Sequence, residues 1–290
     1  MKCDLCPRSC GAERTETRGG GVCGQPSLPV VAKAMLHQWE EPCLVGEHGA
    51  GTVFFSGCNL RCCFCQNGPI SQEGFGKTVS VERLRQIFRE LIARGAACLD
   101  LVTPTHFSHA VIEALGEEDW DVPVVWNCGG YEKVETLRRL EGKVQVYLPD
   151  LKYAIGEKAK KYSAAEDYFE VATAAILEMF RQTGPYVLED GQLKRGVLIR
   201  HLLLPGELEN TRRVIDWVAA NFRPGDVLFS LMSQYTPQVG ADGNLKRHVT
   251  KAEYRAAAAY MENCGVLDGF TQERTSAKEE YTPEFDLQGV

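Results

Sequence analysis

The feature that most constrains this chain is a short cysteine-rich segment, Ser56–Asn67, which reads SGCNLRCCFCQN. Its residues Cys58, Cys62 and Cys65 have a Cys-x3-Cys-x2-Cys spacing, and the apolar run before them predicts a buried strand at Thr52–Ser56. Three thiolates on so short a loop can bind three irons of a cubane four-iron four-sulfur (4Fe-4S) cluster, while the fourth iron has no protein ligand nearby. The spacing therefore predicts an iron–sulfur site with one open iron.

Two other interpretations of this segment are a zinc site and a chance grouping of cysteines. Zinc closed tetrahedrally needs a fourth ligand close by, and Cys63 is poorly placed for that role because it adjoins Cys62 directly. We therefore favour the cluster and interpret Cys63 as a packed bystander. The amino and carboxylate groups of S-adenosylmethionine can bind an open iron, and reductive cleavage then gives a 5′-deoxyadenosyl radical that abstracts hydrogen from a substrate.

The segment resembles the signature of the radical S-adenosylmethionine (radical SAM) superfamily. That signature carries an aromatic residue immediately before its last cysteine, and Phe64 has this position here. The resemblance implies that Phe64 lies near the adenine of the cofactor.

Beyond residue 50, short apolar runs alternate with amphipathic segments, which is typical of βα units around a parallel sheet. Six such units predict an α/β fold, an open (β/α)6 partial TIM barrel over residues 51–275, with its chemistry at the carboxyl ends of the strands. Ser80 predicts a helix start and Gly95 a stop. The remaining strands are expected near Cys98–Val102, Val122–Trp126, Val144–Leu148, Val197–Leu204 and Val227–Leu231, and the other helices near Tyr131–Leu140, Ala165–Gln182, Glu207–Asn221 and Lys251–Asn263.

Composition narrows the functional classes. The formal net charge of -7 disfavours a basic surface for nucleic acid or an anionic bilayer, so we expect neither as a partner. No signal peptide or membrane span is apparent, which predicts a cytoplasmic protein. In that compartment twelve cysteines are better explained by metal binding than by disulfides.

Polar motifs follow the predicted strands at the same rim. The third strand leads into Asn127 and the glycine pair Gly129 and Gly130, which permit close approach of a ligand such as the cofactor's methionyl amine or ribose. The fourth ends in Asp150 and Lys152; the lysine could pair with the cofactor carboxylate, and the aspartate could accept from its amine or ribose.

On the fifth strand, period-two alternation places Arg200 and His201 on opposite faces, so only one can face the interior. We favour Arg200 for the cofactor and keep His201 as a second candidate, either a cofactor or substrate residue or a satisfied core histidine. Polar loops after the second strand, at Thr103–Phe107, and after the sixth, at Ser233–Pro237, are expected to shape the substrate pocket.

The first fifty residues lack an evident helical or alternating apolar pattern and predict a separate cysteine-rich head. Its residues Cys3, Cys6, Cys10 and Cys23 could bind one zinc or a second, auxiliary iron–sulfur cluster. Cys43 is either a substrate-site residue or a buried apolar-like cysteine. The acidic end, residues 276–290, predicts a loosely attached tail.

Taken together, these motifs extend the resemblance over nearly the whole chain. The head with Cys-x-Leu-Cys-Pro-Arg-x-Cys-Gly, the Glu-Glu-Pro-Cys segment, the cysteine segment and the later Met-Ser-Gln-Tyr-Thr-Pro are similar to homologues of pyruvate formate-lyase activating enzyme, of the PflX-like type with an N-terminal four-cysteine head. The Asp-Leu-Lys segment at Lys152 and the Arg-x4-Pro-Gly segment at Arg200 resemble those activases too. Where activases commonly carry a histidine, this chain has Gln234 and Tyr235.

The resemblance implies an oxidoreductase that activates a glycyl-radical enzyme by abstracting hydrogen from a glycine. Its expected partners are that enzyme and an electron donor such as flavodoxin or ferredoxin. One alternative is radical modification of a small molecule or peptide. Another, from a different class, is a non-catalytic binding module stapled by zinc at both cysteine sites.

Overall fold

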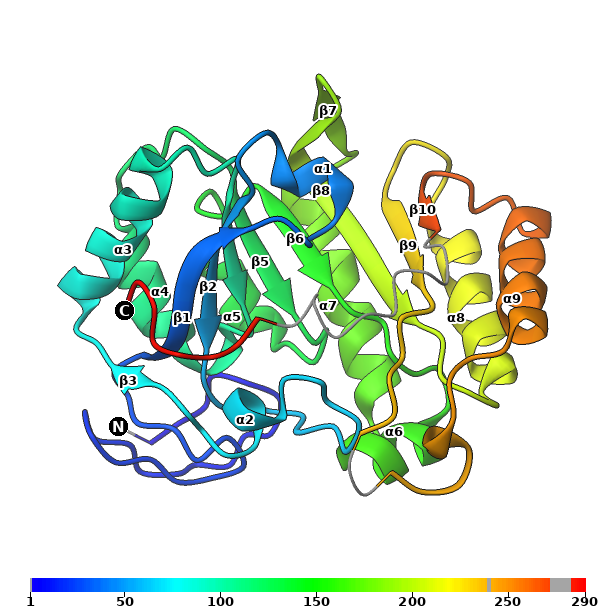
Figure 1. Cartoon of the computed structure of the whole chain (residues 1–290), viewed down its shortest axis with the longest axis horizontal. Helices are drawn as coiled ribbons and strands as arrows, with labels where there is room; N and C mark the ends of the chain where they lie inside the picture. The colour runs from blue at the N-terminus through cyan, green and yellow to red at the C-terminus, as the bar shows by residue number, and fades with distance from the viewer. Residues whose placement is uncertain (1, 239–240, 272–282) are drawn as a thin grey trace.

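A computed structural model describes residues 2–238, 241–271 and 283–290 of the chain (Figure 1). Its centre is a run of six parallel strands in which each strand pairs with the next in chain order. These strands are β2 (Ala50–Phe55), β4 (Leu99–Val102), β5 (Val124–Cys128), β6 (Val146–Pro149), β8 (Gln192–Leu202) and β9 (Leu228–Met232). The six strands predicted from the apolar runs are confirmed, with ends displaced by a few residues.

Additional strands extend both edges of this sheet. β1 (Val30–His37) pairs antiparallel with β2, and β3 (Lys77–Thr78) pairs with the start of β1. At the other edge β10 (Gly269–Thr271) lies parallel to β9, and β7 (Val187–Glu189) forms a hairpin with β8. Within the described residues the sheet stays open, because β10 and β3 are its ends.

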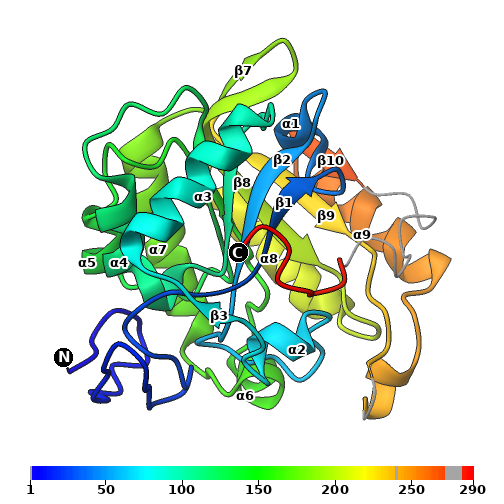
Figure 2. The same ribbon diagram turned by 60° about the vertical axis from the view of Figure 1, so that its left-hand side comes forward.

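Helices cover the outer face of the curved sheet (Figures 1 and 2). The longer ones are α3 (Val81–Ala93), α7 (Tyr168–Thr183), α8 (Leu208–Asn221) and α9 (Lys251–Asn263). The shorter ones are α1 (Pro42–Val45), α2 (Gly68–Ser71), α4 (Ser108–Leu115), α5 (Val134–Arg138) and α6 (Gly156–Ser163), with 3-10 turns at Thr105–Phe107 and Gly243–Lys246. α1, α2, α4 and α6 had no counterpart among the predicted helices.

The helix predicted after Ser80 shows how the local sequence sets an element. The Ser80 hydroxyl accepts a hydrogen bond from the backbone N–H of Arg83 at 3.1 Å, which caps the start of α3. Apolar side chains at helical spacing are buried against the sheet, and Gly95 follows the helix end with a positive φ of 89°. Both predicted boundaries are confirmed.

Strand alternation separates two apolar regions. On β5, Val124 and Trp126 pack toward the helices, whereas Val125 packs inward with Val146 and Leu148 of β6. α1 contributes Cys43 and Leu44 to this inner cluster, so it closes the interior at the amino-terminal end of the strands, opposite α2 and α6 (Figure 1). The carboxyl end is left for polar residues.

The start of the chain departs from prediction. An irregular head was expected through residue 50, but Val30–His37 is the strand β1, hydrogen-bonded to β2 from Val31 to His37. A charged residue, Lys33, interrupts the apolar pattern of this strand and obscures it in the sequence. Lys33 is tolerated in a largely buried position because its ammonium pairs with Asp286 at 2.9 Å. Residues 2–29 alone form the irregular head, which lies at the carboxyl end of the strands (Figure 2).

The predicted loose tail is wrong for its described part. Leu287 N–H donates to Ala32 O, and Ala34 N–H donates to Gln288 O, so residues 283–290 bind the outer edge of β1. Phe285 also packs edge-on against Phe54 at 5.5 Å. An exposed strand edge invites pairing, and this segment satisfies it; residues 276–282 of the predicted tail lie outside the described residues.

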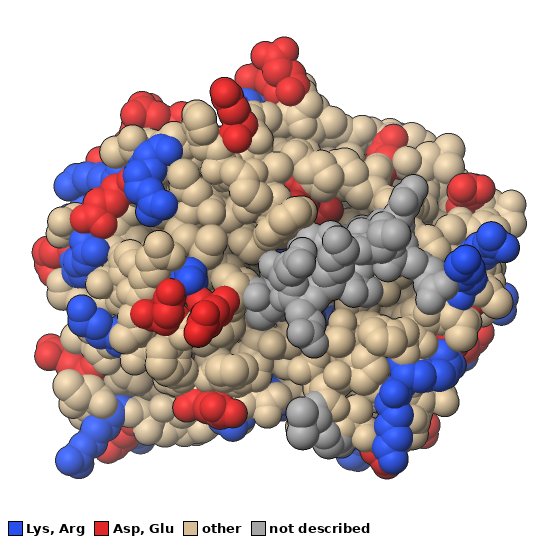
Figure 3. All heavy atoms as spheres, in the orientation of Figure 1, with Lys and Arg blue, Asp and Glu red and all other residues tan. Residues whose placement is uncertain are grey.

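Charged side chains of both signs are interspersed over the described part of the face shown in Figure 3. Several ion pairs join two exposed side chains, such as Arg89 with Glu118 and Arg181 with Glu141. Such pairs contribute little to stability. No helix among the described residues is both long and apolar enough to cross a bilayer.

Candidate active site

A cavity opens at the carboxyl end of the central strands. The cysteine loop, residues 57–67, follows β2 and forms part of the wall of this cavity. Cys58, Cys62 and Cys65 all line this cavity, whereas Cys63 is exposed and does not. Gly57 begins the loop with a φ of 82°, and a Cβ there would lie 2.3 Å from Gln25 Cγ. Only glycine fits this turn without displacing the head.

Each of the three sulfurs has a hydrogen-bond donor. The backbone N–H of Leu60 lies 3.3 Å from Cys58 Sγ, the Ser163 hydroxyl 2.9 Å from Cys62 Sγ, and the Ser71 hydroxyl 3.3 Å from Cys65 Sγ. Burial raises the pKa of Cys58 to about 12 and raises that of Cys65 as well. These two thiols are therefore harder to deprotonate than a free cysteine, and a bound cation would favour their thiolate forms.

This donor set fits an iron–sulfur cluster. Three thiols share one cavity, each sulfur has one hydrogen-bond donor, and such donors are a known influence on cluster potential. Cys63 lies outside the cavity, but it is exposed, so the prediction that it is packed is wrong.

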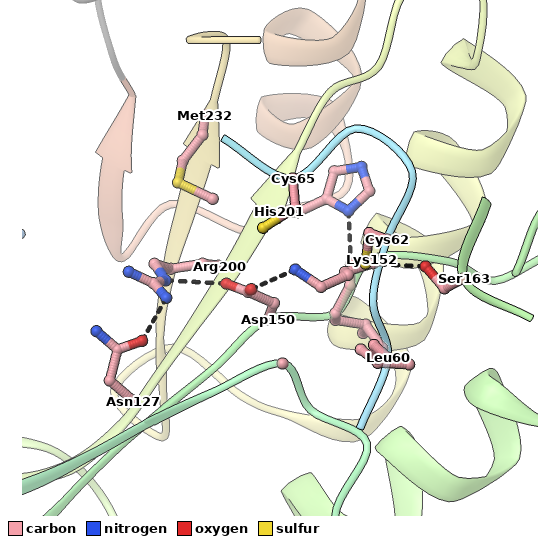
Figure 4. A network of polar contacts seen from close by, with 12 residues as sticks. Leu60, Cys62, Cys65, Asn127, Asp150, Lys152, Ser163, Arg200, His201 and Met232 are labelled. Carbon is pink, nitrogen blue, oxygen red and sulfur yellow. Dashed lines mark hydrogen bonds and ion pairs between the residues drawn. The ribbon is translucent and has the colours of Figure 1, made fainter. Parts of the chain in front are cut away.

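Next to the sulfurs, a row of charged groups crosses the cavity (Figure 4). Lys152 Nζ lies 2.5 Å from Asp150 Oδ2, and Arg200 Nε lies 3.0 Å from Asp150 Oδ1. Arg200 Nη2 donates to Asn127 Oδ1 at 2.6 Å. Burial alone would raise the pKa of Asp150, but Lys152 and Arg200 outweigh it and hold that pKa below its usual value. Asp150 is therefore ionised and orients both cations.

Strand alternation explains why these side chains meet. Asn127, Asp150 and Arg200 each continue the inward-facing set of β5, β6 and β8, two residues beyond inward apolar residues. Arg200 lies opposite Asp150, and Asn127 lies opposite Leu148, two residues before Asp150, so the carboxyl ends of the strands bring the three side chains together at the rim.

Glu40 is the site residue that sequence reasoning missed. It precedes α1, and its carboxylate accepts from Arg200 Nη1 at 3.0 Å and from Asn127 Nδ2 at 3.1 Å. Below it lies Asp100, whose pKa is raised well above its usual value by burial and by the nearby Glu40. The Glu-Glu-Pro-Cys motif was the available signal, but nothing local indicated that its first glutamate reaches a strand 160 positions later.

The glycine pair serves two different purposes. Gly129 lines the cavity, and a Cβ there would lie 2.9 Å from Leu60 Cδ1, so its small size lets the cysteine loop approach β5. Gly130 is absent from the described cavity lining; it has a φ of 77°, and a Cβ there would lie 2.1 Å from Asp150 O. The structure therefore gives Gly130 a packing role rather than the predicted cofactor contact.

Tyr168 of α7 is a second site residue that sequence reasoning missed, and no motif pointed to it. It is fully buried, and its hydroxyl oxygen lies 2.6 Å from Asp150 O, 2.9 Å from Gly129 O and 3.0 Å from Lys152 N. One hydroxyl thus ties together the ends of β5 and β6 beneath the charged row.

The position of His201 does not support its predicted role as a cofactor residue. It faces α8, where Nδ1 lies 2.6 Å from Leu151 O and Nε2 lies 2.9 Å from Thr211 Oγ1. Burial lowers its pKa to about 4, so the ring is neutral and both nitrogens are occupied. The alternative of a satisfied core histidine is the one the structure favours, as the alternation with Arg200 implied.

Aromatic residues close one side of the cavity. Phe64 lines it and packs edge-on against Tyr162 at 6.1 Å and Tyr235 at 6.2 Å. Tyr235 donates its hydroxyl hydrogen to Leu245 O at 2.7 Å, and Gln234 also lines the cavity. Of the two predicted pocket loops, the sixth-strand loop contributes Gln234, Tyr235 and Thr236, whereas the second-strand loop contributes Thr103 alone.

The four head cysteines differ in exposure. Cys3 and Cys6 are buried, Cys23 is half-buried and Cys10 is exposed. Burial raises the pKa of Cys6 to about 12, and Cys3 and Cys23 lie near enough to add to that effect. Among the described residues no group of three or more His, Cys, Asp or Glu side chains is arranged to hold a metal ion. This holds for the cysteine loop as well as for the head, so metal binding at both places stays a prediction. Cys43 is buried beneath the site and does not line the cavity.

Comparison with known proteins places the fold. No protein-family model matches the chain. The uncharacterized protein MJ0674 of Methanocaldococcus jannaschii is 28% identical over 277 residues, which cover 90% of this chain and 74% of that protein.

Three solved structures share the architecture at low identity. Methylornithine synthase (PylB) gives a TM-score of 0.52 at 15% identity, covering 75% of this chain and 63% of PylB. SuiB of Streptococcus suis gives 0.50 at 13%, covering 77% and 48%, and a cysteine-to-alanine mutant of spore photoproduct lyase gives 0.50 at 11%, covering 81% and 79%. This chain thus spans about half of SuiB and less than two thirds of PylB.

The fold is an open partial TIM barrel. These neighbours are radical SAM enzymes with that fold, so the predicted fold class is confirmed. At such identities the likeness is one of fold, and the PflX-like type rests on the motifs alone.

Proposed function

We propose that this protein is a radical SAM enzyme. One observation carries the proposal: three cysteine thiols from one loop line the same cavity as Asp150, Lys152 and Arg200. A sulfur-lined end beside a charged, hydrogen-bonding end matches the needs of a cluster and of a zwitterionic sulfonium nucleotide. The partial barrel shared with radical SAM enzymes supports it.

The residues divide the work by position. Cys58, Cys62 and Cys65 would hold a 4Fe-4S cluster, and Phe64 would pack near the adenine. Lys152 is placed for a carboxylate, because it lies at the sulfur end of the charged row. Asn127, Gly129, Asp150 and Arg200 would bind the amine and ribose. When bound, the cluster and S-adenosylmethionine supply an electron and a carbon-centred radical that abstracts hydrogen.

The rest of this network keeps the binding residues in place. Asp150 orients both cations, Glu40 holds the far side of Arg200, and Tyr168 fixes the backbone below them. Side chains held by several hydrogen bonds lose little further freedom on binding.

For the substrate, we infer a glycine of a glycyl-radical enzyme, with a small electron-transfer protein such as flavodoxin or ferredoxin as the electron donor. The resemblance of the Asp-Leu-Lys and Arg-x4-Pro-Gly segments to activases supports this. Gln234 and Tyr235 stand where activases commonly have histidine, and this difference keeps radical modification of a small molecule or peptide as the second candidate.

The chemistry is tested by anaerobic reconstitution with iron and sulfide, followed by measurement of 5′-deoxyadenosine after adding S-adenosylmethionine and a reductant. Wild type should form the product, Cys58→Ala should not, and Cys63→Ala should, since Cys63 lies outside the cavity. Zinc at the cysteine loop without product formation would instead indicate the non-catalytic binding module.

The substrate is tested separately. Turnover that rises on adding a glycyl-radical enzyme, with a glycyl radical visible by electron paramagnetic resonance, would support activation. Turnover unaffected by any such protein would favour a small molecule or peptide.

A further inference from the structure

Arg8 links the N-terminal head to the surroundings of the cysteine loop. It lies between the head residues Cys6 and Cys10, and its guanidinium donates to three backbone carbonyls. Nε reaches Asn59 O at 2.8 Å, Nη2 reaches Ser163 O at 2.8 Å and Nη1 reaches Ala164 O at 2.5 Å. One side chain therefore joins the cysteine loop to the end of α6.

The end of α6 is where Cys62 finds its donor. The Ser163 hydroxyl, which lies 2.7 Å from Tyr153 OH, donates to Cys62 Sγ at 2.9 Å. The next residue, Ala164, has a left-handed backbone conformation with a φ of 48°. This conformation is unfavourable for alanine, so contacts with the surrounding residues must stabilise it. Arg8 binds the carbonyls of both residues, so it acts on the backbone that aims this hydroxyl.

The planar guanidinium is itself fixed from a further side. It lies over the ring of Tyr131 at 5.2 Å, and the backbone carbonyl of Tyr131 accepts a hydrogen bond from Asn59 Nδ2 at 2.7 Å. Five N–H donors in a rigid fork suit three divergent carbonyls, and a lysine ammonium cannot reproduce that geometry.

Other contacts dock the head without Arg8. Lys133 pairs with Asp4 at 2.6 Å, and the Thr136 hydroxyl donates to Leu5 O at 2.8 Å. Arg14 donates to His106 O at 2.7 Å. Removing the Arg8 fork should thus leave the head attached while releasing the end of α6.

We propose that Arg8 is a positioning residue through which the head sets the reduction potential of the cluster. This rests on the proposed function, in which Cys62 is a cluster ligand. A hydrogen bond to a ligand sulfur stabilises the more negative, reduced cluster, so its loss lowers the potential. The head is then part of the cluster's environment.

The test measures the midpoint potential of the reconstituted cluster by anaerobic titration followed by electron paramagnetic resonance. Ser163→Ala should shift the one-electron equilibrium about tenfold toward the oxidised cluster, which is the effect expected from losing one hydrogen bond to a charged group. A tenfold shift lowers the midpoint potential by about 59 mV. Arg8→Ala should shift it in the same direction, and the double variant should show no further shift, because both changes remove one interaction. Lys133→Ala, which breaks a head contact remote from the sulfurs, should match wild type.

Equal potentials in Arg8→Ala, Lys133→Ala and wild type would overturn the inference, as would an unchanged potential in Ser163→Ala. Should Arg8→Ala fail to fold, Arg8→Lys decides: a lowered potential supports the inference, and the wild-type potential refutes it. A wild-type protein that assembles no cluster would refute the proposed function as well, so the two failures are distinguishable.

Discussion

Glu40 offers the sharpest test of the charged network, because the substitution Glu40→Gln changes one oxygen to an amide. The new side chain can still accept from Arg200, but its NH2 group would face Asn127 Nδ2, which is also a donor. Asn127 cannot simply turn over, since its Oδ1 accepts from Arg200 at 2.6 Å. One buried donor therefore loses its partner.

The magnitude follows from these contacts. A charge-assisted hydrogen bond becomes a neutral one, at a cost of about 1 kcal/mol, and an unsatisfied buried donor adds about 1 to 2 kcal/mol. Glu40 and Arg200 are largely buried, with side-chain exposures of 12% and 14%, so solvent cannot compensate. We expect the free energy of unfolding to fall by about 2 to 3 kcal/mol.

The assay is urea denaturation of the metal-free protein under reducing conditions at neutral pH. The matched control is Glu90→Gln, which breaks the bidentate pair of Glu90 with Arg83 at 2.8 and 3.2 Å on the exposed face of α3. That surface pair should contribute less than about 1 kcal/mol. Equal effects of the two substitutions would refute the assignment of Glu40 to a buried network.

Three further predictions concern single side chains. Tyr168→Phe should destabilise the fold by about 1 to 3 kcal/mol, since it leaves buried backbone groups unsatisfied, whereas Tyr260→Phe, which loses one surface contact, should be nearly neutral in the same denaturation assay. Burial raises the pKa of Glu132 to about 7 from an ordinary 4.5, so between these pH values the folded chain keeps a proton that the unfolded chain releases. The free energy of unfolding should therefore fall as the pH rises from 4.5 to 7. Glu132→Gln should lessen that fall in pH-dependent melts. Lys152→Ala should weaken S-adenosylmethionine binding by roughly 1.5 to 3 kcal/mol in calorimetry, while Lys143→Ala at a surface pair should not; equal affinities would place the Lys152 side chain outside the cofactor site.

The barrel was predictable because its signals are local. Each central strand is an apolar run between turn residues, and alternation within β8 was enough to put Arg200 and His201 on opposite faces. α4 escaped prediction because it follows a 3-10 turn and has no side-chain cap at its start. The sequence predicted only the polar loop Thr103–Phe107 at this place and no helix after it.

The unpredicted parts depend on contacts between distant residues. Lys33 is tolerated in β1 because Asp286, 253 positions later, pairs with it. Glu40 reaches Arg200 160 positions later, and Arg8 reaches Ser163 155 positions later. Neither local spacing nor composition records such pairs.

The central claim is that three cysteines hold a cluster with one open iron. Mössbauer spectroscopy of protein reconstituted with the Mössbauer-active iron isotope, with and without S-adenosylmethionine, tests it most directly. We predict that S-adenosylmethionine changes the signal of one iron in each four-iron cluster and that Cys63→Ala behaves as wild type does. A spectrum unaltered by S-adenosylmethionine, or a cluster that also requires Cys63, would contradict the account.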